Sequence, residues 1–121
     1  MLNSYEVLGG PSTFNLVWTS QKFHDQNPKL YGAFLAALEE SMGFIGSSKK
    51  DAAELWIKNE NSKLSLDFVL KILNDPENVF TTTPQNVMKY AEFMHKVGSI
   101  KEKPASWKDL FFPEIHGKQG S

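Results

Sequence analysis

Apolar residues recur at three- and four-residue spacing along most of this chain, a period that predicts helices. The longest such stretch begins after Asn27 and Pro28, which fit an N-cap followed by proline at the first helical position. Gly46 is expected to end this helix. The inward-facing positions of the helix are Leu30, Tyr31, Phe34, Leu35, Leu38, Met42 and Ile45.

Capping residues mark further helix starts along the chain. Ser48 with Asp51 is similar to a capping box, Ser65 can cap the next helix, and Thr83 with Pro84 can begin another. These capping residues, together with the residues that end each helix, predict helices at 28–45, 48–60, 65–74, 84–97 and 106–111.

Two segments near the amino end have the character of strands. Residues 3–8 are short and compatible with a strand, and the Gly-Gly-Pro-Ser cluster at 9–12 breaks them. Residues 14–20 alternate with a period of two, and because Val17 is apolar as well, we expect this strand to be covered on both faces. The alternating apolar positions are Phe14, Leu16 and Trp18.

About two strands and four to five helices make a helix-rich chain with too few strands for a sheet of its own. A sheet of two strands is marginal, because open edges and an unburied face remain. The missing strands could come from a region outside this sequence or from a second copy. We therefore also expect a homodimer that pairs residues 14–20 between two copies.

Composition narrows the chemistry. The chain has 121 residues, a length that favours one domain. Its net charge of −1 gives no overall positive electrostatic potential that would attract nucleic acid. It has no cysteine, which excludes disulfides and thiolate chemistry. All 13 basic residues are lysines, so no arginine is present to form bidentate hydrogen bonds with an anion. An anion held here would need backbone N–H groups, hydroxyls or lysine.

No catalytic or metal-binding constellation is readable. The three histidines, His24, His95 and His116, are far apart in sequence, and none has a second ligand three or four residues later on the same helix. Adjacent acidic residues such as Glu39 and Glu40 fit a solvated helix surface. We expect no enzymatic activity, no cofactor and no metal.

A set of motifs, in order along the chain, resembles a known family. The run from Val7 to Trp18, the helix core Phe34–Glu40, the lead-in Thr81–Asn86 and the tail Ser106–Pro113 are together similar to the C-terminal portion of periplasmic solute-binding proteins of the nitrate/sulfonate/taurine class of ABC transporters. The resemblance implies a type II periplasmic-binding fold, in which two α/β lobes close around a ligand. It also implies a periplasmic protein, although no signal peptide follows Met1.

The resemblance divides the chain into a strand and turn near the hinge, residues 1–13, and the C-terminal part of the first lobe with the C-terminal helices, residues 14–121. It implies capture of a small anionic or zwitterionic solute and its delivery to a membrane permease. The turn near the hinge is the candidate ligand site, since glycine lets backbone approach a ligand and hydroxyls can donate to it. The candidate residues are Gly10, Pro11, Ser12, Thr13 and Asn15.

Three alternatives remain open. The turn can be a tight connector with no ligand contact. The chain can belong to the related enzymes of thiamine-pyrimidine synthesis, although its lack of cysteine argues against this. It can also be a truncated helical remnant that only self-associates.

Overall fold

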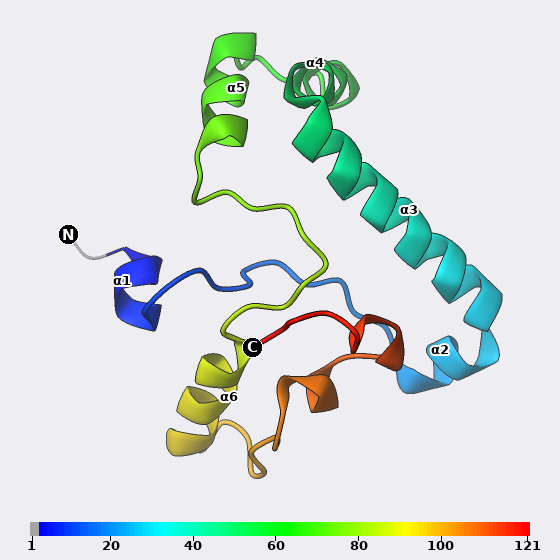
Figure 1. Cartoon of the computed structure of the whole chain (residues 1–121), viewed down its shortest axis with the longest axis vertical. Coiled ribbons are helices and arrows are strands. Elements are labelled where there is room, and N and C mark those ends of the chain that lie inside the picture. Colours follow the sequence, from blue (N-terminus) through cyan, green and yellow to red (C-terminus); the bar gives the residue numbers. More distant parts are fainter. Residues whose placement is uncertain (1–2) are drawn as a thin grey trace. The chain divides into compact units, whose positions relative to one another are not determined.

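The computed structural model describes residues 3–121, in which the regular elements are all helices (Figure 1). Long and short helices follow one another along the chain, and the last two are single 3-10 turns. They are α1 (Ser4–Leu8), α2 (Gln21–Gln26), α3 (Pro28–Ser47), α4 (Lys49–Asn59), α5 (Leu66–Asn74), α6 (Val87–Lys96), η1 (Trp107–Leu110) and η2 (Pro113–Ile115).

The prediction of an α/β fold with about two strands is wrong, because residues 3–121 contain no strand. The first predicted strand is α1 instead. Asn3 Oδ1 accepts a hydrogen bond from the Glu6 N–H at 2.8 Å, and the Glu6 carboxylate accepts one from the Asn3 N–H at 2.9 Å. This reciprocal capping box starts a helix, and Gly9 ends it with a left-handed φ of 74°.

The second predicted strand, residues 14–20, has no regular secondary structure. A strand needs a neighbour to pair its backbone N–H and C=O groups. No neighbouring strand exists within residues 3–121, so the alternating pattern does not form a sheet. The apolar side chains of this segment are left exposed, with Phe14 and Trp18 both at 86% of full exposure.

The predicted helices from residue 28 onward are found, with their ends shifted by up to three residues. Pro28 occupies the first turn of α3, although the Asn27 amide donates to the Phe23 carbonyl at 2.9 Å and does not cap α3. Gly46 lies inside α3, so it is not the predicted stop. The last predicted helix is the 3-10 turn η1, and the short α2, capped by Ser20, was not predicted.

The described chain forms two compact units. Unit 2 is Thr19–Thr81 and contains α2 to α5. In it α4 packs against both α3 and α5, and α2 contacts α3. Its buried core is small, consisting of Ala53 in α4 and Val69 in α5.

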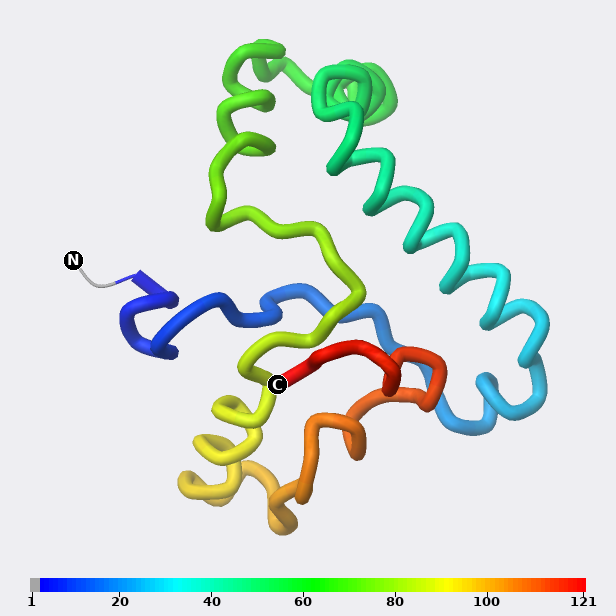
Figure 2. The backbone as a smooth tube through the Cα atoms, in the orientation of Figure 1, coloured from blue at the N-terminus to red at the C-terminus, as the bar shows by residue number. Residues whose placement is uncertain are grey.

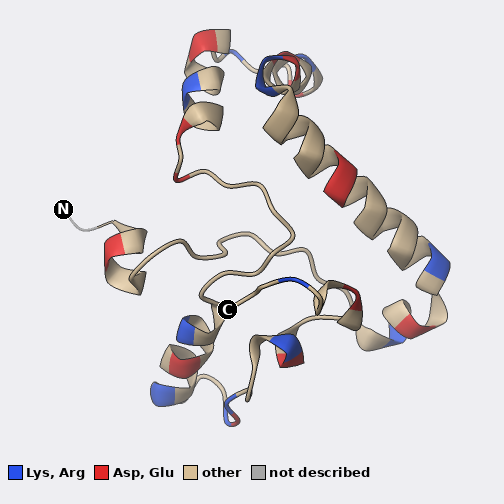
Figure 3. Cartoon of the chain, viewed as in Figure 1, with Lys and Arg blue, Asp and Glu red and all other residues tan. Residues whose placement is uncertain are grey.

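Helix α3 is the least covered element of unit 2. None of its residues from Pro28 to Ser47 is buried, and Leu30 and Phe34 are 58% and 49% exposed. Only Lys29, Glu39 and Glu40 are charged in this twenty-residue helix, as its mostly uncharged ribbon in Figure 3 shows. A helix this apolar is typical of the interior of a larger assembly.

Unit 1 combines the residues up to Trp18 that the structure describes with Thr82–Ser121. Its core is formed by Val87 and Ala91 of α6 together with Trp107 and Ile115. The Trp107 ring meets His116 edge-on at a centroid distance of 5.8 Å. This core joins α6 to the two 3-10 turns.

The two units leave an unusually large surface uncovered. The chain exposes 9227 Å². Two separate compact units of half this mass would expose about 8,000 Å² in total. Among residues 3–121, twenty-one large hydrophobic side chains are exposed and no large side chain is completely buried. Much apolar surface is therefore available for another protein surface.

Replacing Ala53 by leucine is expected to destabilise unit 2 by about 1–3 kcal/mol, because Ala53 has no exposed surface and a larger side chain must displace its neighbours. Ala36→Leu, at an exposed position of α3, is the matched control and should leave stability nearly unchanged. Urea unfolding followed by circular dichroism measures both. Equal midpoints for the two variants would contradict the packing described here.

Candidate functional site

The candidate ligand segment lies against the residues that precede α6, within unit 1. The Thr13 N–H donates to the Gln85 carbonyl at 2.8 Å, and the Gln85 N–H donates to Thr13 Oγ1 at 2.8 Å. The Asn86 amide donates to the Pro11 carbonyl. Two consecutive residues before α6 therefore hold the segment in a defined conformation.

A lysine anchors the beginning of the same segment. Lys89 Nζ donates to the Leu8 carbonyl at the end of α1, where a cation is favourable. Glycine is favoured at position 9 because its φ of 74° is left-handed. A Cβ there would lie 2.9 Å from Lys89 Nζ, the end of a flexible side chain that can shift.

The five candidate residues are not equivalent in the structure. Gly10, Ser12 and Thr13 are half-buried, whereas Pro11 and Asn15 are exposed. Hydrogen bonds join Pro11 and Thr13 to the start of α6. The structure does not bring Asn15 into this cluster.

The start of α6 is built by Asn86 and Ser121, neither of which the sequence predicted as a site residue. Asn86 precedes the helix with a left-handed φ of 53°, a conformation that asparagine tolerates better than most residues. The Val87 N–H donates to the Ser121 carbonyl oxygen at 2.8 Å, and the Asn86 N–H donates to Ser121 Oγ at 3.0 Å. The predicted N-cap at Thr83 is therefore wrong, because α6 begins at Val87.

The cluster offers several hydrogen-bond donors. Backbone N–H groups of Thr13 and Gln85 and the Asn86 amide already donate within the chain. The hydroxyl groups of Ser12 and Thr13 each carry one proton, and the Lys89 ammonium has three, one of which is directed at Leu8. Hydroxyls and an ammonium group suit an anionic or zwitterionic ligand better than a cation.

A second polar group lies at the junction of α2 and α3 in unit 2. The His24 ring, and then the Gln21 amide, hydrogen-bond to the Asp25 carboxylate and hold its pKa below its ordinary value. The His24 ring also meets the Tyr31 ring at a centroid distance of 4.6 Å. These contacts fix the corner between the two helices.

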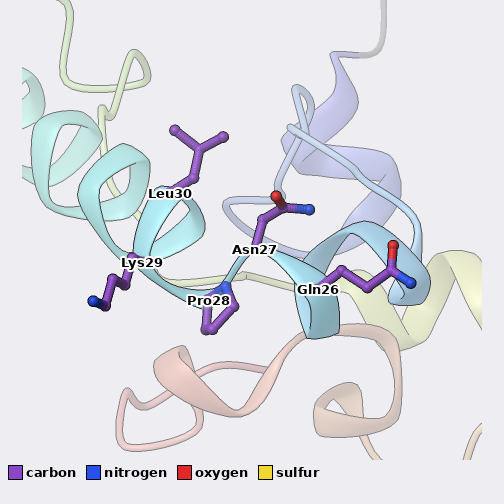
Figure 4. A pocket seen from close by; sticks show the side chains of 5 residues that line it. All are labelled: Gln26, Asn27, Pro28, Lys29 and Leu30. Carbon is purple, nitrogen blue, oxygen red and sulfur yellow. The ribbon is translucent and has the colours of Figure 1, made fainter.

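An open depression of about 410 Å³ lies at the same junction, lined by the consecutive residues Gln26 to Leu30. In Figure 4 the side chains of Gln26, Asn27 and Lys29 point in different directions. No convergent set of polar groups forms there, so the depression lacks the character of a specific ligand site.

No family model, curated protein or solved structure matches the chain. Within residues 3–121, no group of three or more His, Asp or Glu side chains is placed to hold a metal ion. None of the described helices is both long enough and apolar enough to cross a membrane.

Replacing Thr13 by valine is expected to destabilise the attachment by about 1–2 kcal/mol, because the Gln85 N–H loses its half-buried acceptor. Thr13→Ser keeps the hydroxyl and should behave nearly like the parent chain. Hydrogen exchange of the Gln85 amide, followed by NMR, measures the difference. Equal exchange in the two variants would show that the hydroxyl does not hold Gln85.

Proposed function

We propose that this chain is part of the solute-binding component of an ABC importer and that Gly10–Thr13 contribute to its ligand site. The solute is a small anionic or zwitterionic molecule, such as a sulfonate, taurine or nitrate. The partner is the membrane permease to which the solute is delivered, and the compartment is the periplasm. The reaction is binding and release, with no covalent step.

One observation supports the proposal most directly. Thr13 is joined by two hydrogen bonds to Gln85, a residue 72 positions later in the sequence. The segment that the resemblance assigns to the ligand is therefore pre-organised, which lowers the entropic cost of binding. An unconstrained connector between helices would not require such an attachment.

The uncovered apolar surface also supports membership of a larger protein. Helix α3 and the exposed segment after Thr13 expose side chains that a larger protein would cover, among them Phe34 and Trp18.

The first test is the coding sequence on the 5′ side of the Met1 codon. If the reading frame continues there, the longer protein should bind taurine, methanesulfonate or nitrate in calorimetric titrations. Replacing Ser12 and Thr13 together by alanine should weaken binding at least about tenfold. Ser41→Ala, on exposed α3, is the control. A longer protein that binds none of the three solutes would contradict the proposal.

The 121-residue chain alone should bind these solutes weakly. A clamp made of two lobes buries its ligand from both sides, and this chain supplies one short ligand segment. Submicromolar binding of any of them by the chain alone would contradict its assignment as one part of the clamp.

A second candidate function is self-association without a ligand. The large exposed apolar surface favours it. A stop codon directly upstream of Met1, together with stable oligomers and no solute binding, would favour this candidate over solute capture.

A further inference from the structure

The C-terminal residues of unit 1 pass very close to its central tryptophan. A Cβ added to Gly120 would lie 2.7 Å from Trp107 Cε2 and 2.9 Å from Cδ2. Contacts this short do not occur for real side chains, and Trp107 is itself only 8% exposed and cannot move away easily. Glycine is required at position 120 because of space.

The next residue then closes the start of α6. Ser121 accepts hydrogen bonds from the Asn86 and Val87 N–H groups and donates its own N–H to the Pro84 carbonyl at 3.0 Å. Figure 2 shows the C-terminal end of the chain lying at the beginning of α6. Three backbone groups before and in the first turn of the helix are thus satisfied by one residue.

Asn86 connects this contact to the candidate site. Its backbone N–H is held by Ser121, while its side-chain amide holds the Pro11 carbonyl. Its neighbour Gln85 holds Thr13. Asn86, whose φ is left-handed, is therefore contacted from both sides, by Ser121 at its backbone N–H and by Pro11 at its side chain.

We propose that Gly120 and Ser121 are positioning residues for the ligand segment, acting through Asn86. The ligand role of this segment rests on the proposed function, whereas the contacts of Gly120, Ser121 and Asn86 do not depend on it. When Gly120 lies against Trp107, Ser121 reaches α6, and Asn86 then orients toward Pro11. A displaced tail releases Asn86 and loosens the segment from Pro11 to Thr13.

The test compares Gly120→Ala with Gly117→Ala, where an added Cβ meets nothing within 4 Å. Amide hydrogen exchange is measured by NMR on the 121-residue chain without solute. Gly120→Ala should speed exchange of both the Val87 and Thr13 amides by about tenfold or more, and Gly117→Ala should change neither. The Val69 amide in unit 2 should stay unchanged in both variants.

A second pair of variants tests the same contact with a smaller change that should leave unit 1 folded. Ser121→Ala removes only the acceptor of the Asn86 N–H, and Ser121→Thr restores a hydroxyl. The alanine variant should speed exchange at Asn86 and Thr13 by several-fold, and the threonine variant should recover the parent rates. The Ile115 amide, which donates to Phe112, should not respond and reports whether unit 1 is intact.

Faster exchange at Asn86 and Val87 with unchanged exchange at Thr13 would overturn the proposal, since the tail would then only cap α6. Unchanged exchange at all three positions would overturn it as well. Neither result depends on whether the protein binds a solute. Failure of this inference is therefore separable from failure of the proposed function.

Discussion

Replacing Trp107 by alanine should unfold unit 1 while unit 2 keeps its helices. Trp107 is 8% exposed and packs with Phe111, His116 and Gly120. Removing a buried tryptophan costs about 3–5 kcal/mol. A unit with so small a core has stability near the low end of the usual 5–15 kcal/mol, so the loss removes most of it.

NMR spectra of the labelled variant measure this result residue by residue. Resonances of α6 and the two 3-10 turns should collapse to unfolded positions, while those of α4 and α5 remain. Trp18→Ala is the matched control, because Trp18 is 86% exposed, and its effect should stay within about 0.5 kcal/mol. If both units unfold together in Trp107→Ala, they are one cooperative domain and the division described above is wrong.

The chain should also associate with itself at tens of micromolar. Its exposed surface exceeds that of two compact units by more than about 1,000 Å². A stable interface takes about 800 Å² from each partner, so the excess is sufficient for a dimer. Sedimentation velocity across a dilution series measures the association, and a monomer of 13.7 kDa at all concentrations would contradict it.

Two variants locate the contact. Phe34→Glu places a charge on α3, and Val17→Lys places one in the segment that the sequence predicted as a pairing strand. Both side chains are well exposed, at 49% and 69%, so neither change should unfold the monomer. We expect Phe34→Glu to weaken association by about tenfold or more, since α3 exposes the large apolar side chains of Leu30, Phe34 and Phe44. A larger effect of Val17→Lys would support the homodimer through residues 14–20.

The helices could be predicted because their signals are local. Apolar spacing, Pro28 at a first turn and Ser65 as a cap all act within a few residues, and α3, α4 and α5 lie close to where they were expected. The strands could not be predicted from such signals. A period of two at Phe14–Ser20 describes a strand only when a second strand supplies its hydrogen-bond partners.

The candidate site was only partly predictable for the same reason. Ser12 and Thr13 were singled out as polar residues beside glycines, but their attachment to Gln85 and Asn86 joins distant parts of the sequence. The role of Ser121 was missed because nothing local marks it. An asparagine at position 86 was the one local signal, since asparagine favours turns and tolerates the left-handed conformation that it has here.

The two units differ in how far apart in the sequence their contacting residues lie, and this sets their order of formation. Helices α3, α4 and α5 contact their sequence neighbours, so unit 2 can fold quickly and while the chain is still being synthesised. Unit 1 requires Ser121 to reach Val87 and Gln85 to reach Thr13. At about 5–20 residues per second, its N-terminal segment waits about 5–21 s between the emergence of Trp18 and that of Ser121. During this interval unit 1 is more open to proteases and chaperones than unit 2, whose helices have already formed.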